Sequence, residues 1–533
     1  MLTTRFPRGV EKILLPLQRT VKRQVKVAAN QQINDDKSQT EIDEIPISEA
    51  RPYEDIPGPK AWPIVGNTLR FLPYIGNFFV KFLNCYMAAM MIVPFLEQMK
   101  NLRNKYGDMF KIDNLGRQCF LFICDQKLIE KVFRLQGIYP YRISGESMQY
   151  YRESRDSIYK GEYGTIFSFS QGKKWHDFRS KVNQHMLQPR AIRPHVGQIN
   201  EVTEDLLSKI RNIRDSKTLE VPPNFNNELN KWALESICSI ALNQRLGCLE
   251  PNLASDSDPQ KLIDCVRELI ILSFKLDIGL RLWRIFPTPQ MKRFFHIADT
   301  LNEISLKYIN QAKKNFEKNP SKNLQDSSVL EKLMQIDEHT ALIMALDMFM
   351  AGVDTTSTLV TAFLYYLATN EEKQEKLRKE AEMLLPTKDT PVTADILNQA
   401  SYLKACIKES HRLFPVVSGT ARTMPTDIAL NGYRIPQGVC IIPCQSIISM
   451  QAENFPRPDE FIPERWLKNS GDFPSAKTAH PYTFMPFGFG ARMCIGKRFA
   501  EMEAEVLGLK MARNFKLEWH HGPLKYRTNE IEV

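Results

Sequence analysis

The most constraining feature of the sequence is a glycine-rich loop around one cysteine, FGFGARMCIG, at residues 487–496. Its three glycines let the backbone come close to the sulfur of Cys494, and the next nineteen residues, KRFAEMEAEVLGLKMARNF, predict a helix. A cysteine just before a helix has its thiolate stabilised by the helix dipole and by free backbone N–H groups. The loop therefore predicts that Cys494 is a soft metal ligand rather than a buried thiol.

Composition excludes several other kinds of chain. The 533 residues are 43% hydrophobic and 25% charged, which is ordinary for a globular protein and unlike a disordered, collagen-like or disulfide-stapled chain. The other nine cysteines form no C-x-x-C and show no metal-ligand spacing, so we expect them to be buried, inert thiols.

Hydrophobic patterns predict a mainly helical fold with a small β-sheet region, in one large domain. Strand-like runs cover Met109–Cys124 and Ile428–Pro443. Helices are predicted over Ile199–Arg214, Glu228–Gln244, Pro259–Leu276, Phe294–Lys318 and, as one long helix, from about Leu330 to Thr369.

The long predicted helix carries an unusual polar cluster, AGVDTT, at residues 351–356. Glycine costs about 1 kcal/mol relative to alanine in a helix interior, and the side chains of Asp354 and Thr355 compete for backbone hydrogen bonds. Apolar residues surround the cluster, so we expect the helix to bend or loosen there.

Other short patterns are weak evidence for a function when each is taken alone and are informative only in combination. Glu409 and Arg412 lie three residues apart on one helical face, a pairing common on surface helices. Trp175 and Arg179 are one helical turn apart, and a PERW stretch at 463–466 lies downstream.

The cysteine loop resembles the haem-thiolate loop of the cytochrome P-450 monooxygenase family, and the other motifs follow in that family's order from about Pro57 onward. The resemblance implies that Cys494 ligates the iron of haem b, where a thiolate favours O–O cleavage. It implies that Thr355 and Asp354 manage oxygen and protons. Bidentate guanidinium–carboxylate pairing suits the haem propionates, and the implied haem-binding residues are Trp175, Arg179, Arg422, Arg492 and Phe487. The implied structural network is Glu409, Arg412 and Arg465.

The first 30 residues carry seven basic residues and one acid, and apolar residues follow helical spacing, as in a mitochondrial presequence. The alternative is a solvated or membrane-surface helix. We expect a presequence at 1–34, a polar linker at 35–56 and the haem-thiolate domain at 57–533. The apolar stretch Phe82–Leu96 is shorter than the about 20 residues of a membrane span, so we expect a core or interfacial helix and peripheral membrane association.

The resemblance is closest to the mitochondrial branch, and most of all to arthropod members. It implies a location on the matrix side of the inner membrane and electrons from NADPH through ferredoxin reductase and ferredoxin. The lysines expected to face ferredoxin are Lys404 and Lys408, with Lys497 and Arg498 extending the basic patch.

The expected reaction inserts one oxygen atom from O2 into a lipophilic substrate, steroid-like or xenobiotic, and no nucleic-acid partner is expected. Two alternatives stay open: a haem-thiolate isomerase or dehydratase that needs no external electrons, and a non-catalytic haem carrier or sensor. The substrate itself is not encoded in any motif.

Overall fold

The computed structural model describes residues 45–60, 92–113, 119–142, 145–165, 170–251, 253–278, 281–319 and 327–524. Residues 1–34 and most of Phe82–Leu96, on which the presequence and interfacial-helix predictions depend, lie outside these ranges. The described chain is mainly helical with a small sheet region, which confirms the predicted fold class.

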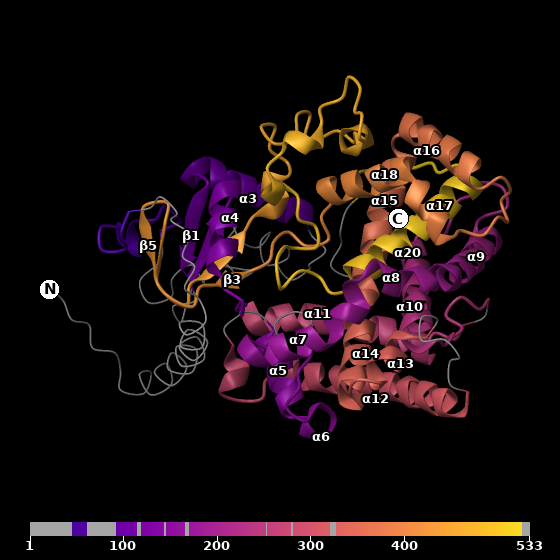
Figure 1. The fold of residues 1–533 in the computed structure, drawn as a ribbon, viewed down its shortest axis with the longest axis horizontal. Helices are drawn as coiled ribbons and strands as arrows, with labels where there is room; N and C mark the ends of the chain where they lie inside the picture. Colours follow the sequence, from indigo (N-terminus) through magenta and orange to yellow (C-terminus); the bar gives the residue numbers. More distant parts are fainter. Residues whose placement is uncertain are drawn as a thin grey trace.

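Helices make up most of the right-hand side of the view in Figure 1. The predicted helices are present as α9 (Val196–Ile213), α10 (Phe225–Leu242), α11 (Asp258–Ile278) and α12 (Pro289–Lys318). Sixteen of the eighteen side chains of α10 are buried, so this helix lies inside the core, packed against α9, α14 (Glu338–Gly352) and α15 (Asp354–Ala368). Two further helices complete the packing around α15: α18 (Ser401–Leu413) and α20 (Lys497–Asn514).

Strands from both halves of the chain meet on the other side of the molecule (Figure 1). One sheet has the order β1-β2-β6-β3, formed by Met109–Asp113, Cys119–Ile123, Cys440–Pro443 and Arg422–Thr423. β1 and β2 are antiparallel, whereas β2 and β6 are parallel, with Leu121 opposite Ile441. β4 (Ile428–Leu430) and β5 (Tyr433–Ile435) form a separate antiparallel pair. The predicted strand run 428–443 is therefore divided between two sheets.

The long helix predicted from Leu330 begins later than expected. α13 (Val329–Met334) is a separate short helix, and α14 starts at Glu338 because the carboxylate of Asp337 accepts the Thr340 N–H and caps it. The expected break in the polar cluster is present, since α14 ends at Gly352 and α15 starts at Asp354. A Cβ at Gly352 would lie 2.9 Å from Cγ1 of Ile237, so glycine allows α10 to pack closely against the break.

Within the described residues, one helical stretch, Glu338–Ala368, is long and apolar enough to cross a bilayer, but 78% of its most apolar window is buried in the protein. It is the core helix pair α14–α15.

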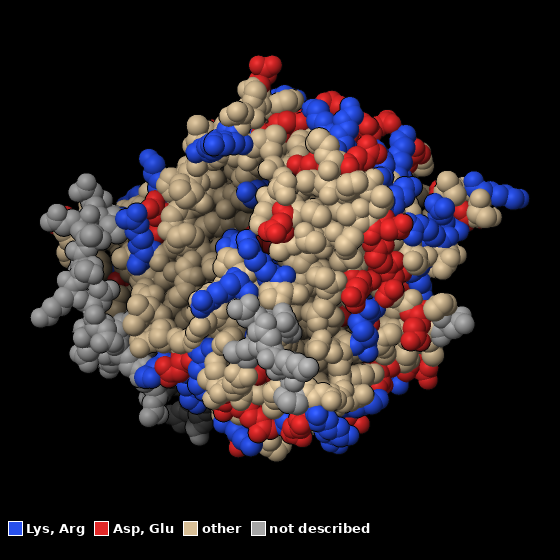
Figure 2. Space-filling view, turned by 45° about the vertical axis from the view of Figure 1, so that its right-hand side comes forward, with Lys and Arg blue, Asp and Glu red and all other residues tan. Residues whose placement is uncertain are grey.

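The described cysteines apart from Cys494 are buried, as expected, except Cys119 and Cys265, which are half-buried. A space-filling view shows a hollow in one face of the molecule, with Lys and Arg side chains at its edge (Figure 2).

Candidate functional site

The cysteine loop is a tight turn that ends at α20. The backbone N–H of Cys494 donates to the Phe487 carbonyl at 2.8 Å, which closes the loop. Gly488 and Gly490 have φ of 72° and 73°, a left-handed conformation that favours glycine. Gly496 is the N-cap of α20, so the cysteine lies directly before the helix amino terminus.

The side chain of Cys494 combines exposure with dense protein surroundings. Its side chain is exposed, yet burial among protein atoms raises the pKa of the thiol, while the Gly496 N–H and the charges of Arg179 and Arg142 act to lower it. A sulfur that is accessible and also surrounded by protein fits a ligand held inside the molecule.

Four arginines gather near this cysteine: Arg179, Arg422 and Arg492 are buried, and Arg142 is half-buried. Burial lowers the pKa of all four guanidinium groups, that of Arg142 and Arg179 to about 10, and the positive charges of Arg142, Arg422 and Arg179 lower that of Arg492 further. Within the described part of the chain, none of the four forms an ion pair with a carboxylate. Burying several like charges is costly unless an anion compensates them.

The contacts that hold these arginines are mostly neutral. Arg179 donates from Nη2 to the Met493 carbonyl at 2.7 Å, and Arg142 donates from Nη2 to the Arg492 carbonyl at 2.6 Å. Arg422 donates from Nε to Oε1 of Gln136 at 2.6 Å. The cluster is thus anchored to the cysteine loop itself.

Several buried N–H donors around Cys494 have no hydrogen-bond acceptor among the described residues. Nη2 of Arg422, Nη1 of Arg492, Nε of Arg142 and Nε1 of Trp175 are buried and have no hydrogen-bond partner among the described residues. The guanidinium of Arg492 stacks on the Trp175 ring at 3.9 Å. Unsatisfied donors around a thiol match the needs of haem, whose two propionates would supply the anionic acceptors. The residues present therefore fit haem.

Sequence reasoning did not single out Arg142 or Gln136. Each is an isolated polar residue with no motif spacing, and only the fold brings them beside Cys494 and Arg422. Gln171 was also missed: its Oε1 accepts Nη2 of Arg492 at 2.8 Å, and its Nε2 donates to the Arg142 carbonyl at 2.8 Å. It lies just before the helix that carries Trp175 and belongs to no motif, so the sequence gave no signal for it.

The polar cluster of the central helix lies at the junction of α14 and α15. The Thr355 hydroxyl donates to the Ala351 carbonyl at 2.7 Å, across the junction. Asp354 is the first residue of α15, and burial raises the pKa of its carboxyl while the charge of Arg267 acts to lower it. A carboxyl whose pKa is raised is better able to hold and pass on a proton.

A second acid near this junction was also missed. The Thr356 hydroxyl donates to Oε2 of Glu503 at 3.2 Å, joining α15 to α20. Burial raises the pKa of the Glu503 carboxyl to about 8, so this side chain is protonated at neutral pH. Its position in an apparently ordinary helix hid it from sequence reasoning.

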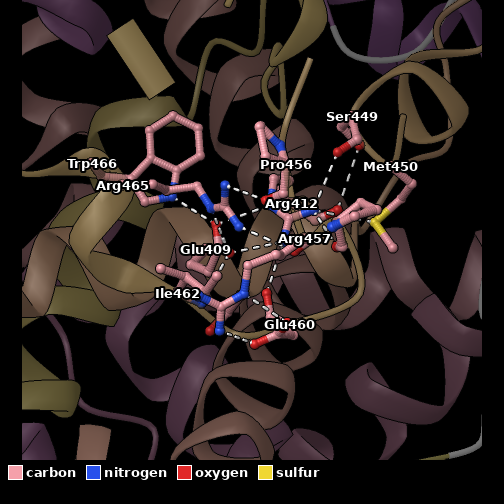
Figure 3. A network of polar contacts seen from close by, with 12 residues as sticks. Glu409, Arg412, Ser449, Met450, Pro456, Arg457, Glu460, Ile462, Arg465 and Trp466 are labelled. Carbon is pink, nitrogen blue, oxygen red and sulfur yellow. Dashed lines mark hydrogen bonds and ion pairs between the residues drawn. The ribbon is translucent and has the colours of Figure 1, made fainter. Parts of the chain in front are cut away.

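Glu409 lies at the centre of a buried ion network (Figure 3). Its Oε1 accepts from Nη2 of Arg412 at 2.7 Å and from Nε of Arg465 at 3.0 Å, and all three side chains are fully buried. The Trp466 indole adds a further donor, with Nε1 2.8 Å from Oε2 of Glu409. The i, i+3 pair of the sequence is thus a core network that ties α18 to the 463–466 turn.

The four expected ferredoxin-facing residues lie on α18 and α20, which pack together. Lys408 and Arg498 are exposed, whereas Lys404 and Lys497 are half-buried. Nζ of Lys404 donates to the Leu397 carbonyl at 2.5 Å. Acids share this surface: Arg498 pairs with Glu501 at 3.4 Å, and burial raises the pKa of Glu505 to about 7 while Lys404 acts to lower it.

Comparison with known proteins supports the same assignment. The family model for cytochrome P-450 matches residues 56–530. The chain belongs to the cytochrome P-450 family. It is 40% identical over 440 residues, 80% of this chain and 81% of the relative, to the "Probable cytochrome P-450 12a5, mitochondrial" of Drosophila melanogaster. It is 37% identical over 481 residues, 90% of this chain and 84% of the relative, to the "Probable cytochrome P-450 301a1, mitochondrial" of the same organism.

A third relative, the "Cytochrome P-450 12b1, mitochondrial" of Drosophila acanthoptera, is 33% identical over 490 residues, 91% of this chain and 88% of the relative. As a cytochrome P-450, this chain is an oxidoreductase, a haem-thiolate monooxygenase that incorporates oxygen from O2. These relatives confirm the expected resemblance to the mitochondrial cytochromes P-450 of arthropods.

Proposed function

We propose that this cytochrome P-450 is a mitochondrial monooxygenase that holds haem b on Cys494 and hydroxylates a lipophilic, steroid-like or xenobiotic substrate. The observation that carries the proposal is the cluster of four arginines beside Cys494, three of them buried, with no carboxylate partner among the described residues. Bound haem would supply the oxygen chemistry. The protein's own part is to bind and orient the cofactor, exclude water and deliver protons.

Arg142, Arg179, Arg422 and Arg492 would pair with the two propionates, and the Trp175 indole N–H would donate to one of them. Phe487 would lie beside the cofactor, at the start of the loop that its carbonyl closes by accepting the Cys494 N–H at 2.8 Å. The Glu409 network would keep the 463–466 turn and α18 in place below the loop.

On the side of α14 and α15, Asp354 would hold a proton on its half-buried carboxyl and pass it toward the oxygen substrate. The Thr355 hydroxyl would accept a hydrogen bond from the protonated Asp354 carboxyl, since its own hydrogen is donated to the Ala351 carbonyl at 2.7 Å. This arrangement gives the two residues different roles, one as the acid and the other as the acceptor that orients it.

Location and membrane contact belong to the proposal. The names of the relatives include the word mitochondrial, and the basic first 34 residues would direct import to the matrix. The family match starts at residue 56, next to the proposed end of the linker at 35–56 and start of the domain at 57. Three apolar side chains in one short turn, Leu282, Ile285 and Phe286, are 44%, 57% and 50% exposed. The exposed Lys292 and Arg293 follow shortly after in the chain, and an apolar patch followed by basic residues suits the inner-membrane surface.

Electrons would reach the haem from NADPH through ferredoxin reductase and ferredoxin docked over α18 and α20. The test is the rate at which reduced ferredoxin reduces the purified protein under carbon monoxide, which needs no substrate. Lys408→Glu should slow this rate at least tenfold at low salt and less at high salt. Lys404→Glu should have a smaller effect, because this ammonium is already bonded to the Leu397 carbonyl.

Lys127→Glu is the matched control, because Lys127 is exposed on α4 (Gln126–Leu135), beside the sheets and away from α18 and α20 (Figure 1). An equal slowing by Lys127→Glu and Lys408→Glu would contradict the docking site. Turnover with a hydroperoxide alone, and none with ferredoxin and NADPH, would favour the isomerase alternative.

A further inference from the structure

A buried ion pair outside the proposed haem contacts joins the 145–165 segment to the central helix. Nη1 of Arg152, on α5 (Glu146–Glu153), lies 2.8 Å from Oδ1 of Asp347 on α14, and the two side chains are 2% and 0% exposed. The same nitrogen donates to the Tyr163 carbonyl at 2.8 Å. Removing one partner of such a pair leaves a buried charge uncompensated, so the pair fixes where this segment lies.

The other carboxylate oxygen of Asp347 holds the backbone of the same segment. Oδ2 accepts the Thr165 N–H at 2.9 Å. Gly164, directly before it, has φ of 80°, and a Cβ there would lie 2.3 Å from Oδ2 of Asp347 and 2.8 Å from Nη1 of Arg152. The close approach that glycine permits is therefore what allows the loop to settle on the carboxylate.

From Thr165 the contacts continue to the cysteine loop. The Thr165 hydroxyl accepts from Nη1 of Arg179 at 3.4 Å, and Nη2 of Arg179 donates to the Met493 carbonyl at 2.7 Å, next to Cys494. Nε of Arg179 also donates to Oδ1 of Asn183 at 2.7 Å, so three acceptors hold the guanidinium, and one of them, Thr165, depends on Asp347. A guanidinium oriented in advance loses less side-chain entropy when it binds an anion.

We propose that Asp347, together with Arg152 and Gly164, is a positioning site for the haem: it places the Thr165 hydroxyl so that Arg179 points its fork at a propionate. Asp347 would act on the cofactor only through Thr165, whose N–H it accepts at 2.9 Å. The inference rests on the proposed role of Arg179 in binding haem.

The test measures how fast haem leaves the purified ferric protein for an excess of an apoglobin acceptor. Thr165→Val removes the hydroxyl at nearly constant volume and should speed haem loss about tenfold, as removal of outer-shell support does at metal sites. Thr165→Ser keeps the hydroxyl and should lose haem at the original rate. Asp347→Asn keeps an acceptor for the Thr165 N–H but removes the negative charge opposite Arg152, so its rate should lie between the rates of the original protein and Thr165→Val.

Lys510→Met is the control for general destabilisation. Lys510 is a fully buried lysine on α20 that pairs with Glu204 and donates to the Thr390 carbonyl at 2.8 Å, contacts that do not involve the four arginines. At an equal loss of thermal stability it should leave haem loss unchanged. If Lys510→Met speeds haem loss as much as Asp347→Asn, the positioning role is refuted.

Arg179→Ala separates this inference from the function it rests on. If Arg179→Ala speeds haem loss and Thr165→Val does not, the positioning site is wrong and the proposed haem contacts stand. If Arg179→Ala leaves haem loss unchanged, the proposed role of Arg179 fails and the inference falls with it. Should Asp347→Asn fail to fold, the Thr165→Val and Thr165→Ser pair still decides.

Discussion

Replacing Trp466 by phenylalanine tests whether the indole belongs to the buried Glu409 network. The substitution removes the donor 2.8 Å from Oε2 of Glu409 and keeps an aromatic ring against Phe484, whose centroid lies 4.5 Å away. Oε2 keeps its other donor, Nε of Arg412 at 2.9 Å, so the carboxylate is not left without a partner on that oxygen.

The expected loss follows from this geometry. A hydrogen bond to a charged group contributes about 1.5–3 kcal/mol to stability. Trp466 is half-buried and Oε2 stays partnered, so we expect the lower end, about 1.5–2 kcal/mol. Glu409→Gln should lower the free energy of unfolding by more, about 3–5 kcal/mol, because two buried guanidinium groups lose their counter-charge.

The assay is urea unfolding of the haem-loaded protein, followed by far-ultraviolet circular dichroism and by Soret absorbance. Trp519→Phe is the matched control, since Trp519 is half-buried like Trp466 and its Nε1 donates to a neutral acceptor, the Gly522 carbonyl, at 2.8 Å. We expect it to change stability by less than about 0.5 kcal/mol. In the Glu409→Gln background the additional loss from Trp466→Phe should shrink, because the acceptor is no longer ionised. Equal losses for the two tryptophan variants would refute the reasoning.

Two further predictions concern the loop and the buried acid. Cys494→Ser should abolish the red-shifted Soret band of the reduced carbon-monoxide complex, and retention of that band would exclude Cys494 as the ligand. Because burial raises the pKa of Glu503 to about 8, above its ordinary 4.5, the folded protein keeps a proton that the unfolded chain releases. The free energy of unfolding should therefore fall as pH rises from about 5 to 8, and Glu503→Gln should flatten this fall in urea titrations; an unchanged slope would mean that Glu503 is already ionised when folded.

Local patterns predicted the elements that carry their own signals. The cysteine loop and its helix, the strand runs and the four long helices follow from glycine spacing and hydrophobic periodicity, and the break at Val353 followed from polar residues in an apolar helix. The long helix was predicted to start too early, because Asp337 can end one helix and cap the next without changing the hydrophobic pattern.

The site was predictable only where its residues lie in spaced motifs. Arg142 and Gln136 carry no local signal, and their role depends on contacts with residues about 350 and 286 positions away. Glu503 looks like an ordinary helix acid, and only packing against Thr356 shows that it is buried. Long-range contacts of this kind arise from the tertiary fold and leave no periodicity in the sequence.

The four arginines beside Cys494 also make the amount of folded protein depend on the supply of haem. They hold like charges together away from water, and the described chain offers them no acid of its own, so the polypeptide by itself is poorly suited to close over them. A tightly held dianion would remove this repulsion and add its binding energy to folding. We therefore expect chains made in excess of porphyrin to open and be degraded, so that tetrapyrrole synthesis limits how much of this enzyme accumulates.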